Sequence, residues 1–438
     1  MKGRKLLPPL VAAAVSIAGC GVSAAQEDTS GEATASEGGS SEGRGGHRIS
    51  DTSSPVVGTS YVSPLVELYG DIFIGERSFV AGNTVLRAAP DRRLEIGDET
   101  NSQDNVIARA LEGDSTIGDE TSLAHHALIR DSEIGDFAFV GFQAEVINAT
   151  VEDGALISAG SYVEDVTIPE DALLAPGTVV TDQATADELP TVETAEEDFK
   201  RAVLEVNAEF AEGYVDLYES EGYDAVVGVG PNPETEFNPE GVEPQIGADS
   251  EVGEFARVVG DVRLGPGSEV SDRAAIRADE GSPIIIGENA RIDERVTFHA
   301  LEETSITVGD NLVADDDTVL HGPLEVGNNL TVADDSVVFR VEVGDNVTVG
   351  EDVIIQSPAS ETEDPNELTL AIPDGAVIPD GAVITDEANL EEALSRPPRR
   401  CRRPAASPWR AYKGARPLGL PSGEACGAGR SPPGPLRV

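Results

Sequence analysis

Five histidines are the residues of this sequence with the widest chemical range, because an imidazole can bind a metal ion or transfer a proton near neutral pH. His299 is followed by Ala-Leu-Glu and His321 by Gly-Pro, while His125 and His126 are adjacent in the first half of the chain. His47 lies near the N-terminus. Since a lone histidine is most often a surface or core residue, the elements around these side chains decide whether they can act together.

The surrounding sequence is an array of short repeats in which an aliphatic residue precedes glycine. Several steps are six residues long, as from Ile246 to Val252 and from Val343 to Val349. In such repeats the aliphatic side chain fills the interior, glycine or asparagine takes a tight turn, and three hexapeptides make one coil. An aromatic content of 4% suits a narrow interior. The pattern predicts an all-β solenoid of two tandem left-handed parallel β-helices.

The array is interrupted near residues 186–240. Apolar residues from Phe199 to Leu217 follow helical spacing there, which predicts an α-helix that packs back on the first β-helix. A second helix is expected to begin at Asp386 and to stop at Ser395. The predicted parts are a lipoprotein signal peptide at 1–20, a disordered tether at 21–54, the first β-helix at 55–225, a linker at 226–239, the second β-helix at 240–395 and a basic tail at 396–438.

The two ends of the chain differ from the array. Near the start, basic residues precede an apolar run that is too short to span a bilayer and that ends in Ile-Ala-Gly-Cys20, which resembles a lipobox. We expect Cys20 to receive lipid and to anchor the protein at the outer face of the cell membrane; ordinary signal cleavage near Ala24 is the alternative. From Arg396 onward acidic residues nearly vanish, which indicates a frameshift artefact or a basic tail.

The net charge of −51 at neutral pH is spread over the whole repeat region. Dense carboxylates that hold water and ions are typical of proteins adapted to high salt. An acidic nucleic-acid mimic or a metal buffer is the other interpretation. The same charge disfavours nucleic acid as a partner.

Several segments of both halves carry the residues named above in a recurring order. They are NSQD at 101–104, ALE at 110–112, SLAH at 122–125, GFQA at 141–144 and VNAEFAEGY at 206–214 in the first half, and IRADEG at 276–281, FHALE at 298–302 and LHGP at 320–323 in the second. In this order, and on a hexapeptide array, these segments resemble the γ-class carbonic anhydrases. The resemblance covers roughly residues 55–225 and 240–395.

In that family three histidines bind Zn²⁺ or Fe²⁺, two from one subunit of a trimer and the third from its neighbour. The corresponding positions here are Arg109, His125 and Arg130 in the first half and His299, Asp316 and His321 in the second. Because an arginine cannot bind a cation, the first half alone cannot hold this metal. The losses are complementary, so the resemblance implies one composite site of His299 and His321 with His125.

Two other arrangements stay open at this point. If the second half assembles with copies of itself, the ligands become His299, His321 and Asp316 of a neighbouring copy, and two histidines with a carboxylate also bind Zn²⁺ or Fe²⁺. Alternatively, the catalytic metal has been lost.

The resemblance also implies roles for residues around the metal. Glu302 moves the proton out, Glu280 bonds to the metal-bound hydroxyl or to bicarbonate, and the amides that orient water or CO₂ are those of Gln103 and Asn207. Arg277 is expected to pair with Asp279 or Asp293 across the interface between the halves and to be structural.

Three classes of function compete. The first is an extracellular carbonic anhydrase that interconverts CO₂ and bicarbonate, with its domains packed as a homo-oligomer or in a trimer-like way. The second is a non-catalytic hexapeptide-repeat scaffold, because such folds persist without chemistry. The third is an acyltransferase, which the paired carboxylates and the His-Ala-Leu-Glu segment do not suit.

Overall fold

The computed structural model describes residues 46–280, 283–359 and 364–395. The predicted signal peptide with Cys20, the first part of the predicted tether and the tail at 396–438 lie outside the described residues. Among the described residues, no helix combines the length and the apolar character that crossing a bilayer requires.

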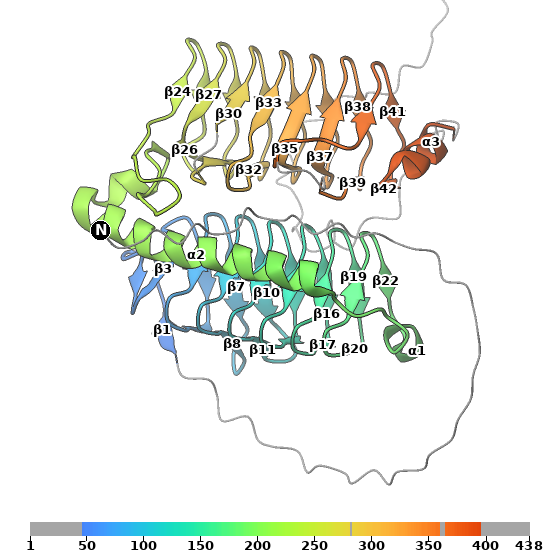
Figure 1. The fold of residues 1–438 in the computed structure, drawn as a ribbon. Coiled ribbons are helices and arrows are strands. Elements are labelled where there is room, and N and C mark those ends of the chain that lie inside the picture. The colour runs from blue at the N-terminus through green and yellow to red at the C-terminus, as the bar shows by residue number, and fades with distance from the viewer. Residues whose placement is uncertain (1–45, 281–282, 360–363, 396–438) are drawn as a thin grey trace, which may run out of the picture. The chain divides into compact units, whose positions relative to one another are not determined.

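The first half of the chain folds into a β-helix with three sheets (Figure 1). Each coil adds one short strand to each sheet, and successive coils pair in parallel. The strands that concern the site run in coil order as β7 (Val85–Ala88), β10 (Ile107–Ala110) and β13 (Leu128–Arg130) in one sheet, β8 (Arg93–Ile96) and β11 (Ser115–Ile117) in the next, and β9 (Asn101–Ser102), β12 (Ser122–Leu123) and β15 (Phe139–Val140) in the third. The predicted β-helix is confirmed.

The interior of this solenoid is a stack of aliphatic side chains. Leu86, Ala108, Ile129 and Val146 succeed one another on neighbouring coils of one sheet and are each 0% exposed. Since alternate residues of a strand point to opposite faces, the intervening positions of the same strands face outward. Burial of each large aliphatic side chain contributes roughly 1.5–3 kcal/mol, so the repeat itself holds the coils together.

Part of the acidic content is structural. The carboxylate of Asp119 accepts a hydrogen bond from the backbone N–H of Asp98 at 2.9 Å, and the carboxylate of Asp136 accepts one from the N–H of Asp119 at 2.8 Å. Each aspartate follows a glycine at a corner and thereby satisfies a turn donor of the coil before it. The same residues therefore contribute both to the net charge and to the stacking of coils.

The glycines before these aspartates allow the coils to approach closely. A Cβ at Gly118 would lie 2.5 Å from the carbonyl carbon of Gly135 on the next coil. We expect Gly118→Ala to lower the free energy of unfolding by about 1–3 kcal/mol, since overpacking forces the backbone to move. Gly113→Ala is the matched control, because its Cβ would meet Asp131 at an ordinary 3.7 Å. Chemical denaturation of both variants tests this, and equal stabilities would contradict it.

A long helix, α2 (Thr194–Glu221), follows a short one, α1 (Gln183–Ala186), and runs along the first β-helix (Figure 1). Phe210 and Tyr214 of α2 pack against Tyr61 and Phe79 of the sheet, with ring centroids 5.0–5.6 Å apart. The helix predicted from the spacing of apolar residues is confirmed.

The second half forms another β-helix, from β23 (Val229–Gly230) to β42 (Val383–Ile384), followed by α3 (Glu387–Ser395). Strands β35 (Val319–Val326) and β37 (Val337–Val343) continue through a corner, so two faces merge into one 13-stranded sheet. Strands β29 (Ala275–Ala278), β32 (Thr297–Ala300) and β35 are neighbours in this sheet.

The structure differs from the sequence prediction at two boundaries. The expected disorder up to residue 54 is wrong for β1 (His47–Ile49), which pairs antiparallel with β5 (Asp71–Ile74) and buries Ile49 to 5% exposure. The expected linker at 226–239 contains β23, which pairs in parallel with β26 (Arg257–Gly260). At β1 the backbone of a polar segment completes a sheet, and at β23 a short Val/Gly segment does so; composition alone does not reveal such pairing.

Candidate metal centre

The two β-helices meet along a corner of the first one, where residues with left-handed backbone donate their side-chain amides. Asn105 (φ 64°) donates to the carbonyl of Arg295 at 3.3 Å, and Gln143 (φ 54°) donates to the carbonyl of Asp317 at 2.7 Å. Sequence reasoning did not identify this corner; the available signal was the amide residues at the turn position of successive coils. These bonds fix the register between the two solenoids.

Two of the predicted ligands lie side by side on the second β-helix. His299 on β32 and His321 on β35 are direct partners in the parallel ladder. Phe298 and Leu320 next to them point inward and are 0% exposed, so both imidazoles project outward from the sheet. The outward face here is covered, because His299 and His321 are only 3% and 2% exposed.

The third predicted ligand comes from the first β-helix. His125 follows β12 at the contact corner and is 0% exposed. Its Nε2 lies 3.4 Å from Nδ1 of His299, and the candidate ligand atoms of His125, His299 and His321 all lie within 4.8 Å of one another. The structure thus brings together, within one chain, the three histidines that the sequence resemblance combined.

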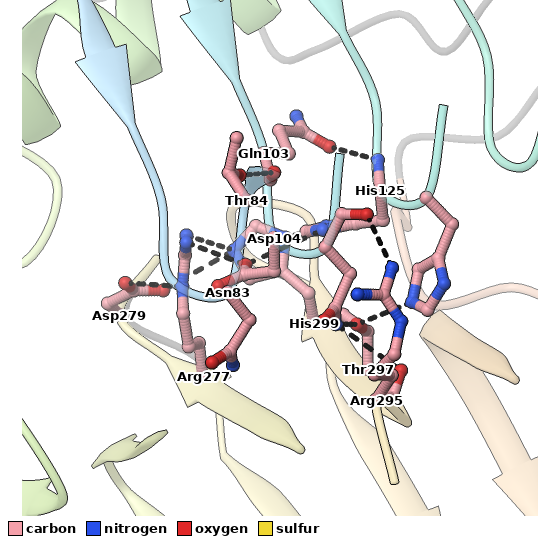
Figure 2. Close-up of polar contacts among 12 residues, drawn as sticks. Asn83, Thr84, Gln103, Asp104, His125, Arg277, Asp279, Arg295, Thr297 and His299 are labelled. Atoms are coloured by element: carbon pink, nitrogen blue, oxygen red, sulfur yellow. Dashed lines mark hydrogen bonds and ion pairs between the residues drawn. The ribbon is translucent and has the colours of Figure 1, made fainter. Parts of the chain in front are cut away.

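The contacts of His321 and His125 leave one nitrogen of each ring available. Nδ1 of His321 lies 3.0 Å from the carbonyl oxygen of Gly322, which only an N–H can satisfy, so Nε2 keeps its lone pair. Nδ1 of His125 lies 3.5 Å from the carboxylate of Asp104, and its Nε2 faces His299. Figure 2 shows Asp104 and His125 of the first β-helix beside His299 of the second.

His299 is turned the other way. Its Nε2 lies 3.3 Å from carboxylate oxygens of Asp279 and Glu280 and 3.3 Å from Nη2 of Arg277, and its Nδ1 faces the cluster. Each imidazole therefore faces an oxygen acceptor with one nitrogen and can offer the other to a cation. Such outer contacts orient histidine ligands at metal sites.

Burial also affects the protonation of two of the three histidines. It lowers the pKa of His125 and of His321 well below the ordinary value, and the neighbouring His299 adds to both shifts. Neutral imidazoles carry the lone pairs that a metal needs. The donor set therefore fits a divalent transition metal bound by three histidines.

Arg277 occupies the ladder position next to His299 and is 3% exposed. It pairs with Asp104 of the first β-helix at 2.8 Å and with Asp279 on its own side at 3.0 Å. The expected alternative partner is wrong, because Asp293 pairs with Arg291 at 3.2 Å. Burial opposes ionisation of Asp279, but Arg277 together with His299 and the Tyr214 hydroxyl outweighs it, so the pKa of that carboxyl is lowered.

Tyr214 is a contact across the interface that the sequence did not reveal. Its hydroxyl on α2 donates to the Asp279 carboxylate at 2.7 Å, and both side chains are buried. Helix α2, which packs on the first β-helix, thereby contacts Asp279, the carboxylate that faces His299. Tyr214 was part of the recognised helix pattern, but the pattern gave no partner for its hydroxyl.

A pocket opens beside His299 and His321 and gathers the other predicted residues. Its polar lining residues are Gln103, Asn207, Glu280 and Glu302, and its apolar ones are Phe139, Phe142, Phe199, Ala202, Val203, Val206 and Leu301. Gln103 Oε1 accepts the backbone N–H of His125 at 3.2 Å. Asn207 Nδ2 donates to the carbonyl of Val203 at 2.8 Å, so both amides are held in place.

The two glutamates of the pocket hold protons more firmly than exposed carboxylates do. Burial raises the pKa of Glu280 to about 7, and burial together with Glu303 and Glu209 raises the pKa of Glu302. Glu280 is 6% exposed, whereas Glu302 is half-buried. Groups with such shifts in a cleft are candidates for proton transfer.

The alternative ligand Asp316 is not part of the histidine cluster. Its carboxylate accepts the backbone N–H of Glu294 at 3.2 Å at a corner of the second β-helix. A site that used Asp316 of another copy stays a prediction. Arg109 and Arg130 lie on β10 and β13 of the first β-helix, where they are direct partners in the ladder.

Comparison with curated proteins gives two short matches, and no family model matches the chain. The chain is 34% identical to the carboxysome assembly protein CcmM of Nostoc sp. over 62 residues. This match covers 14% of the chain and 11% of that protein. The chain is 53% identical to CcmM of Synechocystis sp. over 45 residues, and this match covers 10% of the chain and 7% of that protein. The chain therefore spans about a tenth or less of these relatives' length.

Parts of the chain are also similar to solved structures. A Bacillus cereus protein named as an acetyltransferase matches with a TM-score of 0.33 and 22% identity, over 37% of this chain and 91% of that one. A hexapeptide transferase family protein of Anaplasma phagocytophilum matches with a TM-score of 0.26 and 26% identity, over 35% and 91%.

Proposed function

We propose that this chain is a carbonic anhydrase of the γ-class kind, which interconverts CO₂ and bicarbonate at a metal held by His125, His299 and His321. The observation that carries the proposal is the cluster of these three buried histidines, contributed by both β-helices and lying within 4.8 Å of one another. Neither β-helix alone supplies all three histidines of the cluster. This gives a physical reason for keeping both β-helices in one chain.

Zn²⁺ or Fe²⁺ would be the cofactor. Three neutral imidazoles leave a coordination position open, and a divalent metal there supplies a Lewis acid that makes water a nucleophile near neutral pH. The surrounding chain has to admit a small apolar gas and release an anion. The pocket's phenylalanines and aliphatic residues suit the first task, because CO₂ carries no net charge or hydrogen-bond donor.

The polar residues of the pocket have separable tasks. The side-chain amides of Gln103 and Asn207 are fixed by their bonds and can orient a water molecule or CO₂. Glu280, with a pKa of about 7, can hold a proton on its buried carboxyl beside His299. Glu302 lies nearer to solvent and can pass the proton outward.

Metal removal and replacement test the proposal on the full chain. We expect about one metal ion per chain after anaerobic purification with Zn²⁺ or Fe²⁺ supplied, because one complete set of three histidines is present in the described residues. Chelation should abolish CO₂ hydration, and reloading should restore it. A chain that takes up no metal would overturn the enzyme proposal and leave the non-catalytic scaffold in its place.

Attachment to a membrane is a separate proposal that rests on the sequence around Cys20. We expect Cys20→Ser to move the protein from the membrane fraction to the soluble fraction and to abolish incorporation of labelled palmitate, since a thioether-linked lipid needs the thiol. Fractionation of cells that express both forms measures this. Equal membrane retention of the two forms would rule out the anchor.

A further inference from the structure

The first β-helix carries a ladder of three arginines at the places where the second carries the metal-site ladder. Arg87, Arg109 and Arg130 are direct partners on β7, β10 and β13. In the second β-helix the corresponding partners on β29, β32 and β35 are Arg277 and the two histidines. Both ladders point outward, and Ala-Leu-Glu follows both Arg109 and His299.

Two of the three arginines in this ladder have no carboxylate at ion-pair distance within the described part of the chain. Among the described residues, Arg87 and Arg109 form no ion pair with a carboxylate, and Nε of Arg109 is buried without a hydrogen-bond partner. Arg130 has Asp131 at 3.8 Å. Burial lowers the pKa of Arg109, and the positive charges of Arg87, Arg295 and Arg130 lower it further, while the carboxylate of Glu67 raises it. Such a concentration of cations is unusual on a chain with a net charge of −51.

The ladder of the second β-helix shows which kind of group binds an arginine at this ladder position, because Arg277 there binds a carboxylate. Arg277 receives the carboxylate of Asp104 from the facing β-helix at 2.8 Å, and this contact covers it to 3% exposure. Arg87, at the corresponding position, is exposed. The planar guanidinium fork matches two oxygens on one carbon, so the same chemistry is available to an incoming anion.

We propose that Arg87, Arg109 and Arg130 form a second binding site, for an anion with an O–C–O group. Free bicarbonate and a carboxylate on another copy of this chain share that chemistry. The site is distinct from the histidine cluster and does not depend on the proposed catalytic activity. Three neighbouring guanidinium groups give such an anion several charge-assisted hydrogen bonds at once, and its binding relieves their mutual repulsion.

The test uses the metal-free full chain and labelled bicarbonate in equilibrium dialysis at constant ionic strength. We expect saturable binding that weakens by about tenfold or more in Arg109→Gln, since the central guanidinium is lost. Arg263→Gln is the control, because Arg263 is an exposed arginine of the second β-helix already paired with Asp261 at 2.8 Å. Circular dichroism and metal uptake by the histidine cluster report whether Arg109→Gln is folded.

Sedimentation of the same samples distinguishes the two sources of the anion. If bicarbonate does not bind but the chain self-associates, and Arg109→Gln alone abolishes the association, the site holds a carboxylate of a second copy. Binding and sedimentation that are the same in the original chain and in Arg109→Gln would overturn the proposal. Because the samples are metal-free, failure here leaves the proposed catalytic function untouched, and the reverse also holds.

Discussion

Substitution of His125 by alanine is expected to abolish metal binding and CO₂ hydration, although His125 belongs to the other β-helix from His299 and His321. The reason is geometric, because Nε2 of His125 faces Nδ1 of His299 at 3.4 Å and no other described His, Cys, Asp or Glu joins the cluster. Loss even of a group that supports a ligand costs roughly 10–100-fold at metal sites. We therefore expect a loss in hydration rate of at least about a hundredfold for the ligand itself.

Two matched variants sharpen this result. His126→Gln removes the adjacent buried histidine, which bonds to Thr297 at 3.0 Å and does not belong to the cluster, so metal content should be retained. Asp316→Ala should also retain metal, because Asp316 caps a turn away from the histidines. Metal analysis and stopped-flow hydration measure all three. If only Asp316→Ala lost metal, the site would belong to the second β-helix and its copies, and the composite site would be wrong.

The histidine cluster could be predicted from the sequence because the resemblance to the γ-class carbonic anhydrases implied which histidines combine, although His125 and His299 are 174 positions apart. His299 and His321 stand on repeats, so their register follows from the coil length, and the complementary losses at Arg109 and Arg130 indicated that His125 completes the set. The fold was predictable because each repeat specifies its own corner and its own interior residue.

The electrostatic surroundings could not be predicted in this way. The pairing of Arg277 with Asp104 joins residues 173 positions apart, and it depends on which corner of the first β-helix faces the second. No periodicity encodes that choice. The competing prediction of Asp293 failed because a carboxylate at a corner is satisfied by the nearest arginine of its own strand, Arg291.

The predicted domain boundaries differed from the structure for a related reason. The segment before residue 55 looks disordered by composition, yet β1 supplies backbone hydrogen bonds to β5 with only Ile49 buried. Edge strands gain most of their stability from main-chain pairing, to which polar side chains are no obstacle. Acidic residues were also read as a surface property, although Asp98, Asp119 and Asp136 each satisfy a turn donor.

The largest expected loss of stability follows from the buried charges at the interface. Arg277→Met would leave the Asp104 and Asp279 carboxylates, both 0% exposed at the side chain, without their shared cation. Removing one partner of a buried ion pair costs about 3–5 kcal/mol, because the remaining charge cannot return to water without opening the interface. Since Asp104 also faces His125, metal affinity should fall together with stability.

The double variant Arg277→Met with Asp104→Asn separates charge from packing. Replacing one of the stranded carboxylates by an uncharged amide should recover part of the lost stability if the uncompensated charge is the cause. Arg263→Gln is the exposed control and should change the free energy of unfolding by less than about 1 kcal/mol. Denaturant unfolding at constant salt measures all of them. Equal losses in Arg277→Met and in the double variant would show that the arginine acts through packing and that the charge network does not hold the two β-helices together.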